Sequence, residues 1–428
     1  MFNKLGFSPE VLNTLAKDNN FKKRKRILDS FDFLFALLLN ANKETISYNA
    51  MASTLALKKD KAVSKQALHQ AMSNLCFLNF INQIFEQLMT KKLGISSISS
   101  QFGFQRIIIQ DSTIIKLPGR LASTYSGVRN GFVQVVNARL QYAFDALTNY
   151  SILFELDSYK VNDTKAAANL NVKKGDLVIR DRGYFSLKEM KRLLNNGADF
   201  IYRYKHGVIY YDAETGMRLN LIEVLDLQKT TDIKVRVDDG SNGPIIRLLA
   251  DRVTEEIANQ RRAKLKKEAK TFPSKDVLAL LSWSIFLTSV EKDKADFKKI
   301  FELYKLRWRI EIIFKAMKSH LKLDKIHNVS ETQLKFIIAA KMILFLLIFQ
   351  FVFSWFSKKI EKIFDKELSF SKLCHYLQDN LGVLPDLIIK TFSNHLKKQS
   401  LTAKTLLKYC TYDKRKRQNY NDHLYQFA

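Results

Sequence analysis

The sequence predicts a mixed α/β fold, with a central sheet between helical regions at both ends of the chain. Segments rich in β-branched residues recur between about residues 104 and 205, and helical patterns separate some of them. Apolar residues recur at helical spacing before residue 100 and again after about residue 361. A second β-rich stretch, residues 206–277, interrupts the central pattern, so the sheet-forming part of the chain is expected to be divided in two.

The N-terminal region, residues 1–100, is predicted to be helical. The stretches "ILDSFDFLFALLLNAN" and "VSKQALHQAMSNLCFLNFINQIFEQLM" have dense apolar faces, and Ser64 is the expected N-cap of the second. A helix beginning "SKQALHQAM" is compatible with the DNA-reading helix of a helix-turn-helix, although most such helices are purely structural. The basic run at residues 22–26 fits phosphate contacts and a solvated face equally well.

The first part of the central sheet is expected within residues 101–205. "RIIIQDSTIIKL" is typical of a buried strand, and "FVQVVNARLQYAFD" and "YSILFELDSYK" alternate as two antiparallel strands would. A short helix "KAAANL", a strand "DLVIRD", a helix "SLKEMKRLLNNG" and a strand "DFIYRYK" follow. Ser186 should cap the second helix, and Gly197 lies just past its end.

Residues 206–277 are predicted to be an inserted β-rich domain of two hairpin-like units, with turns near residues 212–216 and 239–243, followed by a basic helix. Residues 278–360 should return to the core with the strand "ALLSWSIFLTSV" and one helix beginning near residue 295. Residues 361–428 are expected to be a basic helical C-terminal region that ends in a polar tail, with four basic residues at 414–417.

The charge of the chain points to a polyanionic partner. Seventy Lys and Arg residues against 42 Asp and Glu give a net charge of +28, which favours nucleic acid first and an anionic membrane surface second. The three cysteines are far apart and the seven histidines form no HxxxH or HxH pair, so a zinc site and a disulfide framework are disfavoured. No phosphate-binding G-x-x-x-x-G-K-[ST] loop exists, so no ATP-driven step is indicated.

One apolar run, "FIIAAKMILFLLIFQFVFSWF" at residues 336–356, is long enough to span a bilayer at about 21 residues. Lys341 and Gln350 interrupt it, and it stands alone in the sequence. A buried core helix is therefore the preferred interpretation, and no membrane partner is expected.

The segment "YKLRWRIEIIFKAMK", residues 304–318, carries a single acid, Glu311, among arginines and lysines. At about 100° per residue, one helical face would gather Glu311 with Tyr304, Arg307, Lys315 and Lys318. Taken alone, this pattern fits a set of i,i+4 salt bridges worth a few tenths of a kcal/mol.

Two other acids favour a different interpretation. Asp111 stands among isoleucines in "IIIQDSTII", where an unpaired carboxylate is costly to bury. Asp181 ends the strand "LVIRD", and α/β sheets place ligands at the carboxyl ends of strands. Together with Glu311 these oxygens could hold divalent cations for chemistry at phosphorus, while Arg307, Lys315 and Lys318 bind phosphates. Asp157 in "FELDSY" is the strongest rival acid.

At this point the residues resemble a known family. The spacing Tyr304-x2-Arg307-x3-Glu311-x6-Lys318 resembles the Tyr-Arg-Glu-Lys signature of bacterial insertion-sequence transposases of the DDE type, in the insertion-sequence-four family. "DST" at 111–113 and "DRGYF" at 181–185 are similar to the regions that hold this family's first and second aspartates. The resemblance covers about residues 20–420.

The resemblance implies an RNase H-like catalytic core, formed by residues 101–205 and 278–360, that carries out cut-and-paste DNA transposition by cleavage and strand transfer at phosphodiesters. It implies Asp111, Asp181 and Glu311 as catalytic metal ligands for two Mg²⁺ ions, with Mn²⁺ as a substitute. It also implies Tyr304, Arg307 and Lys318 as residues that place terminal DNA phosphates. Trp283 is the candidate to receive an extruded base if cleavage passes through a hairpin; the alternative is a core tryptophan.

The expected partners are double-stranded DNA, as the inverted-repeat ends of the element and as target DNA, and a second copy of the chain in a dimer on DNA. No small-molecule substrate is expected, and the expected location is the bacterial cytoplasm, in association with the nucleoid. The alternative is a catalytically silent DNA-binding relative, either decayed or inhibitory, against which the presence of all three acids argues.

Overall fold

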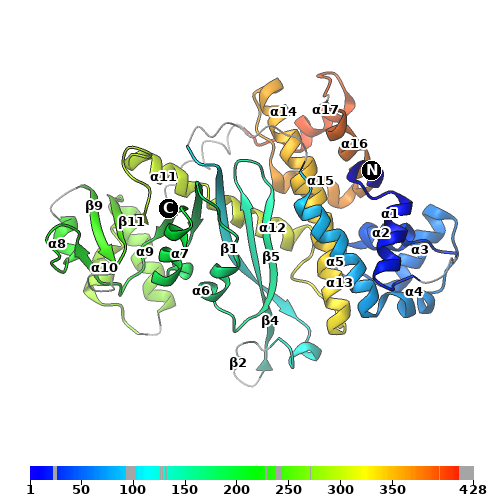
Figure 1. Cartoon of the computed structure of the whole chain (residues 1–428), viewed down its shortest axis with the longest axis horizontal. Coiled ribbons are helices and arrows are strands. Elements are labelled where there is room, and N and C mark those ends of the chain that lie inside the picture. Colours follow the sequence, from blue (N-terminus) through cyan, green and yellow to red (C-terminus); the bar gives the residue numbers. More distant parts are fainter. Residues whose placement is uncertain are drawn as a thin grey trace.

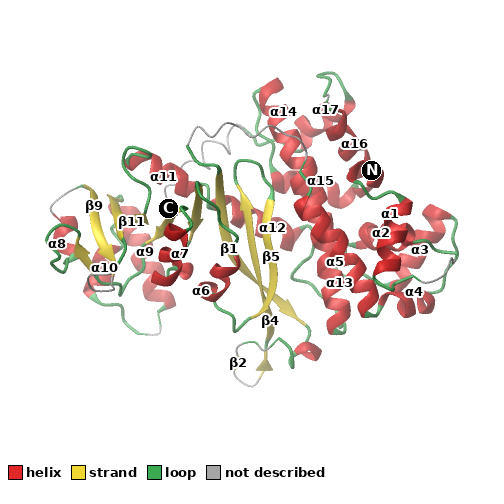
Figure 2. Ribbon diagram, viewed as in Figure 1, coloured by secondary structure: helices red, strands yellow, loops and turns green. Residues whose placement is uncertain are grey.

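A nine-stranded mixed sheet with helices on both faces forms the centre of the molecule (Figure 1, Figure 2). Its strand order is β5-β4-β1-β6-β7-β11-β10-β9-β8, and β2 and β3 form a separate two-stranded ribbon. The computed structural model describes residues 1–22, 27–92, 103–125, 127, 129–130, 133–226, 229–237, 243–269, 271–394 and 396–413.

The strands are β1 (Arg106–Leu117), β2 (Arg129–Asn130), β3 (Val133–Gln134), β4 (Val136–Asp145), β5 (Ser151–Ser158), β6 (Asp176–Arg180), β7 (Asp199–Arg203), β8 (Tyr210–Asp212), β9 (Thr230–Val237), β10 (Ile245–Arg252) and β11 (Trp283–Thr288). The α-helices up to the end of the sheet region are α1 (Pro9–Asp18), α2 (Ser30–Asn40), α3 (Tyr48–Lys59), α4 (Lys65–Met72), α5 (Leu75–Thr90), α6 (Asp163–Ala166), α7 (Leu187–Asn195), α8 (Leu221–Asp226), α9 (Glu255–Glu268) and α10 (Lys275–Leu280). The later ones are α11 (Phe297–Lys305), α12 (Trp308–Ser319), α13 (Glu331–Leu346), α14 (Ser354–Phe364), α15 (Phe370–Asp379), α16 (Leu384–Ser393) and α17 (Leu401–Tyr409).

The first five strands of the core have the predicted order and type. Strands β1, β4 and β5 are antiparallel neighbours, and β6 and β7 continue the sheet parallel to β1. The helical segments α6 and α7 precede β6 and β7, as the sequence indicates. This is an RNase H-like mixed sheet with helical flanks, so the predicted fold class is confirmed.

The strands that follow residue 206 extend the same sheet. Strand β11 pairs with β7, and β10, β9 and β8 continue outward from it (Figure 1). The hairpin of β9 and β10 lies where it was predicted. The unit expected over 207–225 is present in a shorter form: β8 turns back at residues 212–216, the N–H of Asp212 bonds to the carbonyl of Met217, and Tyr211 pairs with Arg218. After Leu219 the chain becomes helical instead of continuing as a strand. There, Asn220 accepts from the backbone N–H of Ile222 and its side-chain amide donates to Glu223, which starts helix α8. Leu221 and Leu225 bury one face of that helix.

The two faces of the sheet are covered by different helices. Ile109, Ile179 and Phe286 belong to an apolar cluster that includes α12, α13 and the helices of both ends of the chain. Strand residues of the opposite parity, such as Val178 and Tyr202, belong to a second cluster with α7 and α8. Side chains alternate between the two faces of a strand, so residues at odd and at even positions along one strand point to opposite faces of the sheet.

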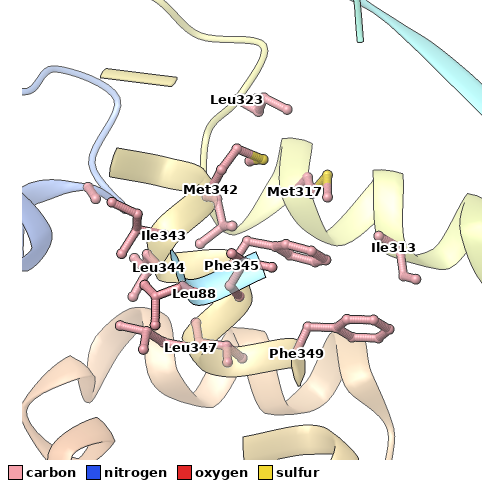
Figure 3. Packing of buried hydrophobic residues seen from close by; sticks show 14 of the residues in the cluster. Leu88, Ile313, Met317, Leu323, Met342, Ile343, Leu344, Phe345, Leu347 and Phe349 are labelled. Carbon is pink, nitrogen blue, oxygen red and sulfur yellow. The ribbon is translucent and has the colours of Figure 1, made fainter. Parts of the chain in front are cut away.

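The long apolar run of residues 336–356 is buried, as predicted. The continuous helical stretch Glu331–Phe364 passes the length and hydropathy test for a membrane span, but 94% of its most apolar window is buried inside the protein. In Figure 3, Met342 and Phe345 of α13 lie toward Ile313 and Met317 of α12, with Leu88 of α5 beside them. This packing makes the run a core helix that joins the N-terminal helices to the sheet.

The polar residue Gln350 is accommodated by a local change of helix type. Residues Leu347–Phe353 form a π-helical segment, and within it the Gln350 amide donates to the carbonyls of Leu88 and Lys91 at 3.1 and 2.8 Å. Its carbonyl accepts from the backbone N–H of Ser151 at 3.2 Å. A buried amide with its hydrogen bonds satisfied costs little, so this glutamine ties α5 and β5 to the core helix.

The single helix predicted from about residue 295 is two helices in the structure. Helix α11 ends at Lys305 and α12 begins at Trp308. Around the break, the N–H of Arg307 bonds to the carbonyl of Tyr304 and that of Ile310 to the carbonyl of Arg307, a three-residue spacing that tightens and bends the helix. The ring of Tyr304 packs 4.4 Å from that of Phe286, so tertiary burial accompanies the bend.

At the N-terminal end, Ser64 caps α4 as predicted, accepting from the backbone N–H of Ala67 at 3.1 Å. Asn74 then caps the separate helix α5, so the long apolar segment after Ser64 is two helices. The basic run at 22–26 falls mostly outside the described residues, as do residues 414–417.

Candidate active site

The backbone register brings Asp111 and Asp181 to the same level of the sheet. Strands β1 and β6 are parallel neighbours, and Ile109 is the partner of Ile179. Asp111 and Asp181 each stand two residues further along. Their side chains therefore point to the same face of the sheet as those of Ile109 and Ile179, which is the face that α12 covers. Neighbouring strands lie about 4.8 Å apart, so the two carboxylates that the sequence singled out lie side by side at the carboxyl end of β6.

Glu311 reaches the same place from α12 through Arg307. The guanidinium of Arg307 donates to Asp111 Oδ2 at 3.1 Å and to Glu311 Oε1. The side chains of Arg307 and Asp111 are 14% and 21% exposed, whereas that of Glu311 is 36% exposed. The structure therefore links all three predicted acids to one place, with an arginine between two of them.

Tyr304 closes the site on the side of β6. Its hydroxyl is 3.4 Å from Asp181 Oδ1, at the long end of a hydrogen bond, and the guanidinium of Arg307 lies 5.9 Å from the centre of its ring. Burial raises the pKa of Tyr304, so the phenol stays protonated and donates to Asp181. Tyr304 and Arg307, on either side of the bend between α11 and α12, both face the acids.

The environment of Asp111 disfavours its charged form. Burial raises the pKa of Asp111 to about 7, Arg307 and the backbone N–H of Ser112 oppose this change, and Asp181 and Asp163 add to it. Burial alone would lower the pKa of Arg307, yet Tyr304 and the nearby acids hold it above its usual range. A desolvated carboxylate beside another acid is a group that a further cation would stabilise.

The predicted lysines lie farther along α12. Lys315 is exposed, one turn beyond Glu311. Lys318 is half-buried; burial lowers its pKa and Asp324 opposes that change. Lys315 is therefore accessible to a ligand that approaches along α12. Lys318 lies close enough to Asp324, after the end of the helix, for that carboxylate to act on its pKa.

Trp283 begins β11 on the face of the sheet opposite to the acids. It is 6% exposed and belongs to the cluster that contains Tyr202 and Leu287. Arg252, its partner on β10, places a guanidinium 5.9 Å from the ring centre. The structure thus gives Trp283 a packed position at the same end of the sheet as Asp181, without direct access to the acids.

Sequence reasoning missed Arg203. It ends β7 next to the level of Asp181, and its charge acts on the phenol of Tyr304 and on the guanidinium of Arg261. Its position could have been noticed in "DFIYR", where a cation follows a buried strand at the same end as "LVIRD".

Asp163 was also missed, because its partners are distant in sequence. It accepts from Ser112 Oγ at 2.7 Å, from Arg139 at 3.0 Å and from Gln141 at 3.1 Å. This network lies behind β1 and fixes the strand directly after Asp111. Asp157, the rival acid, lies opposite Arg139 on the edge strand β5, and burial raises its pKa.

The donor chemistry of the site fits a hard divalent cation. Carboxylate oxygens, such as those of Asp111, Asp181 and Glu311, are the ligands that Mg²⁺ and Mn²⁺ prefer. As the structure stands, no three His, Cys, Asp or Glu side chains among the described residues are close enough to hold a metal ion together. Arg307 occupies oxygens of Asp111 and Glu311, so a cation would have to compete with its guanidinium.

A mixed sheet with two acids at adjacent strand positions and a third on a following helix is the arrangement that the resemblance to DDE transposases leads us to expect. The family model described as "Transposase DDE domain" matches residues 102–347, more than half of the chain. The chain belongs to this family, which confirms the resemblance seen in the sequence.

Similar proteins carry the same description. The chain is 28% identical over 407 residues to the transposase for insertion sequence element IS231C of Bacillus thuringiensis subsp. berliner, covering 88% of this chain and 84% of that protein. It is 27% identical over 401 residues to the transposase for IS1151 of Clostridium perfringens, covering 86% and 82%. A solved piggyBac transposase synaptic complex with hairpin DNA covers 97% of this chain and 90% of its own at 12% identity and a TM-score of 0.43, and the family assignment does not depend on it.

Proposed function

We propose that this DNA transposase cuts and rejoins DNA strands at the inverted-repeat ends of an insertion sequence, using Asp111, Asp181 and Glu311. The observation that carries the proposal is the shared level of Asp111 on β1 and Asp181 directly after β6, with Glu311 linked to Asp111 through Arg307. Membership of the DDE transposase family supports nuclease and strand-transfer chemistry for the chain.

The three acids would hold Mg²⁺, as two ions, or Mn²⁺ in its place. Bound there, the metal would supply activation of the attacking oxygen and stabilisation of the leaving oxygen at phosphorus. The raised pKa of Asp111 supports this assignment, because burial, and to a smaller extent Asp181 and Asp163, disfavours the charged carboxylate, which a bound cation would stabilise. The chain's own contribution is to hold Asp111 and Asp181 in register and to bring Glu311 over them on α12.

The cations around the acids would bind DNA phosphates. Arg307 would exchange its carboxylate bonds for phosphate oxygens when metal takes its place, since a guanidinium suits both. Tyr304 would keep Asp181 oriented by its hydroxyl and help place a terminal phosphate. Lys315 and Lys318 would extend the phosphate contacts along α12, and the rest of the excess positive charge would hold the duplex.

Trp283 remains the proposed receiver of an extruded base, if cleavage passes through a hairpin. Its closeness to the carboxyl end of the sheet supports this role, and its burial under Arg252 supports a core role instead. A base could reach the ring only if the residues that bury it move apart.

The remaining assignments follow from the same function. The helical N-terminal region, residues 1–100, would recognise the element ends together with parts of the basic C-terminal region, residues 361–428. Two copies would act as a dimer on DNA, and the C-terminal helices would contribute contacts between them. The protein would work in the bacterial cytoplasm on nucleoid DNA.

A plasmid excision assay tests the proposal. Asp181→Ala should abolish excision of a marked element while the protein still binds DNA. Asp199→Ala is the matched control, because Asp199 begins the neighbouring strand β7 at the opposite end and pairs with Lys294. Equal excision by the wild type and Asp181→Ala would reject chemistry at this site. Binding without excision by the wild type would favour the alternative, a catalytically silent DNA-binding relative.

A further inference from the structure

Each of the two aspartates is preceded by a buried polar residue that points to the opposite face of the sheet. Gln110 comes before Asp111 and Arg180 before Asp181, and both side chains are fully buried. The Nε of Arg180 donates to Gln110 Oε1 at 2.8 Å, so the two strands are joined side chain to side chain directly behind the acids.

This bond lies where the backbone pairing of the strands stops. The paired residues of β1 and β6 run from Arg106 with Asp176 to Ile109 with Ile179. Asp111 and Asp181 lie two residues past the last pair, and the Gln110–Arg180 bond lies between that pair and the acids. It therefore continues the connection between the strands up to the two carboxylates.

Arg180 is held on all sides, so it can act as a rigid support. Its other donors reach Glu189 Oε1 at 2.6 Å, the hydroxyl of Tyr202 at 3.0 Å and the carbonyl of Ala167 at 3.0 Å. These partners come from α7, from β7 and from the 3-10 helix Ala167–Asn169 that follows α6. A buried guanidinium with such planar, fixed geometry loses little freedom per bond and fixes the groups around it.

Arg192 provides a contrast within the same network. It also binds Glu189, at 2.7 Å, and the carbonyl of Ala167, at 3.3 Å. Its side chain is 29% exposed, and its hydrogen bonds go to residues on the side away from β1. Arg192 thus shares two partners of Arg180 without joining the strands that carry the acids.

We propose that the Gln110–Arg180 pair is a positioning clasp that holds Asp111 and Asp181 at the separation needed to bind divalent metal together. The inference rests on the proposed function, because it assumes that these aspartates are metal ligands. Neither Gln110 nor Arg180 touches the reacting atoms; they act through the strands. Outer groups that hydrogen-bond a metal ligand directly change metal affinity by about ten- to a hundredfold when removed, and a pair that acts through the backbone should fall at the lower end of that range.

The test measures Mn²⁺ binding to the full-length protein by the electron paramagnetic resonance signal of free Mn²⁺, without DNA. Gln110→Met removes the acceptor and keeps the length of the side chain, and it should weaken Mn²⁺ binding about tenfold. Gln110→Glu keeps an acceptor for Arg180 and should bind Mn²⁺ at least as tightly as the wild type; no partner of the Gln110 Nε2 is lost, because that atom has none among the described residues. Arg192→Met is the matched control and should bind Mn²⁺ as the wild type does.

Two results would overturn the clasp: wild-type binding by Gln110→Met, or an equal loss in Gln110→Met and Arg192→Met, which would indicate general loosening of the sheet. If Gln110→Met does not fold, Arg180→Lys serves instead, because it keeps the buried charge but loses the fork; wild-type Mn²⁺ affinity in this variant also overturns the proposal. Asp111→Asn distinguishes failure of the clasp from failure of the metal site. If it too binds Mn²⁺ normally, the metal site itself is wrong, whereas loss in Asp111→Asn alone would reject only the clasp.

Discussion

Arg307 should compete with metal for the acids, so its removal is expected to tighten metal binding while impairing DNA cleavage. Its guanidinium donates to Asp111 at 3.1 Å and to Glu311, and these oxygens are the proposed metal ligands. A cation that binds to the wild type must first displace these two charge-assisted bonds. In Arg307→Gln neither ion pair exists, and the net negative charge of the site is larger by one.

The magnitude follows from the exposure of each pair. The Glu311 side chain is 36% exposed, so its bond with Arg307 contributes at most about 1 kcal/mol. The Asp111 pair is more buried, with side chains 14% and 21% exposed, and a charge-assisted bond there contributes about 1.5 kcal/mol. Displacement thus costs about 2 kcal/mol, which corresponds to about thirtyfold in the dissociation constant.

The assay is calorimetric titration of Mn²⁺ into the full-length protein, followed by a DNA end-cleavage assay. Arg309→Gln is the control on the same helix, since Arg309 donates to the Ala146 carbonyl and to Asn149. Mn²⁺ binding that is weaker in Arg307→Gln than in Arg309→Gln would refute the competition. Wild-type cleavage by Arg307→Gln would refute its role in placing phosphates.

Three further outcomes are expected. Trp283→Phe should keep the fold and, if the indole receives a base, should reduce hairpins more than nicks on a denaturing gel; unchanged hairpins would assign the residue to the core. Phe345→Ala should lower the free energy of unfolding by about 3–5 kcal/mol in denaturant titrations, because the ring is buried 5.5 Å from that of Tyr142 and 5.2 Å from that of Phe349; a loss under 1 kcal/mol would contradict this packing. Burial lowers the pKa of Lys341 to about 7, so between about pH 7 and 10 the unfolded chain binds more protons than the folded one. Stability should rise with pH across that window, by at most about 1.4 kcal/mol per unit, and Lys341→Met should lack the rise.

The strands of the core could be predicted because their signals are local. The isoleucine-rich segment around Asp111 became β1 with the expected bounds, and Asp181 lies directly after β6. The spacing of Tyr304, Arg307, Glu311 and Lys318 could be read from the sequence even though the helix geometry assumed for it was too regular. A sequence motif depends only on which residues are present and at which spacing, so it can be recognised even when the backbone geometry predicted for it is wrong.

The features that sequence reasoning missed depend on pairing between distant segments. Nothing local shows that β10 and β9 continue the central sheet, because the pairing of β11 with β7 decides it. The bend at residues 306–307 accompanies the burial of Tyr304 against Phe286, which comes from another strand. The face taken by Trp283 depends on the register of β11, and a shift of one residue would reverse it.

The division of the sheet into two faces explains why the site is stiff on one side and adaptable on the other. Behind the acids, Arg180 and Gln110 are fully buried and every donor of Arg180 that bonds is held by a separate element. In front of them, the carboxylates meet Tyr304 and Arg307 from the bent junction of α11 and α12, and Glu311 is more than a third exposed. The rigid face fixes the spacing of two ligands, while the exposed face lets Arg307 and Glu311 rearrange when metal and phosphate arrive. A sequence motif alone does not distinguish the residues that fix the spacing of the ligands from those that rearrange. The alternation of side chains between the two faces of β1 and β6 does distinguish them.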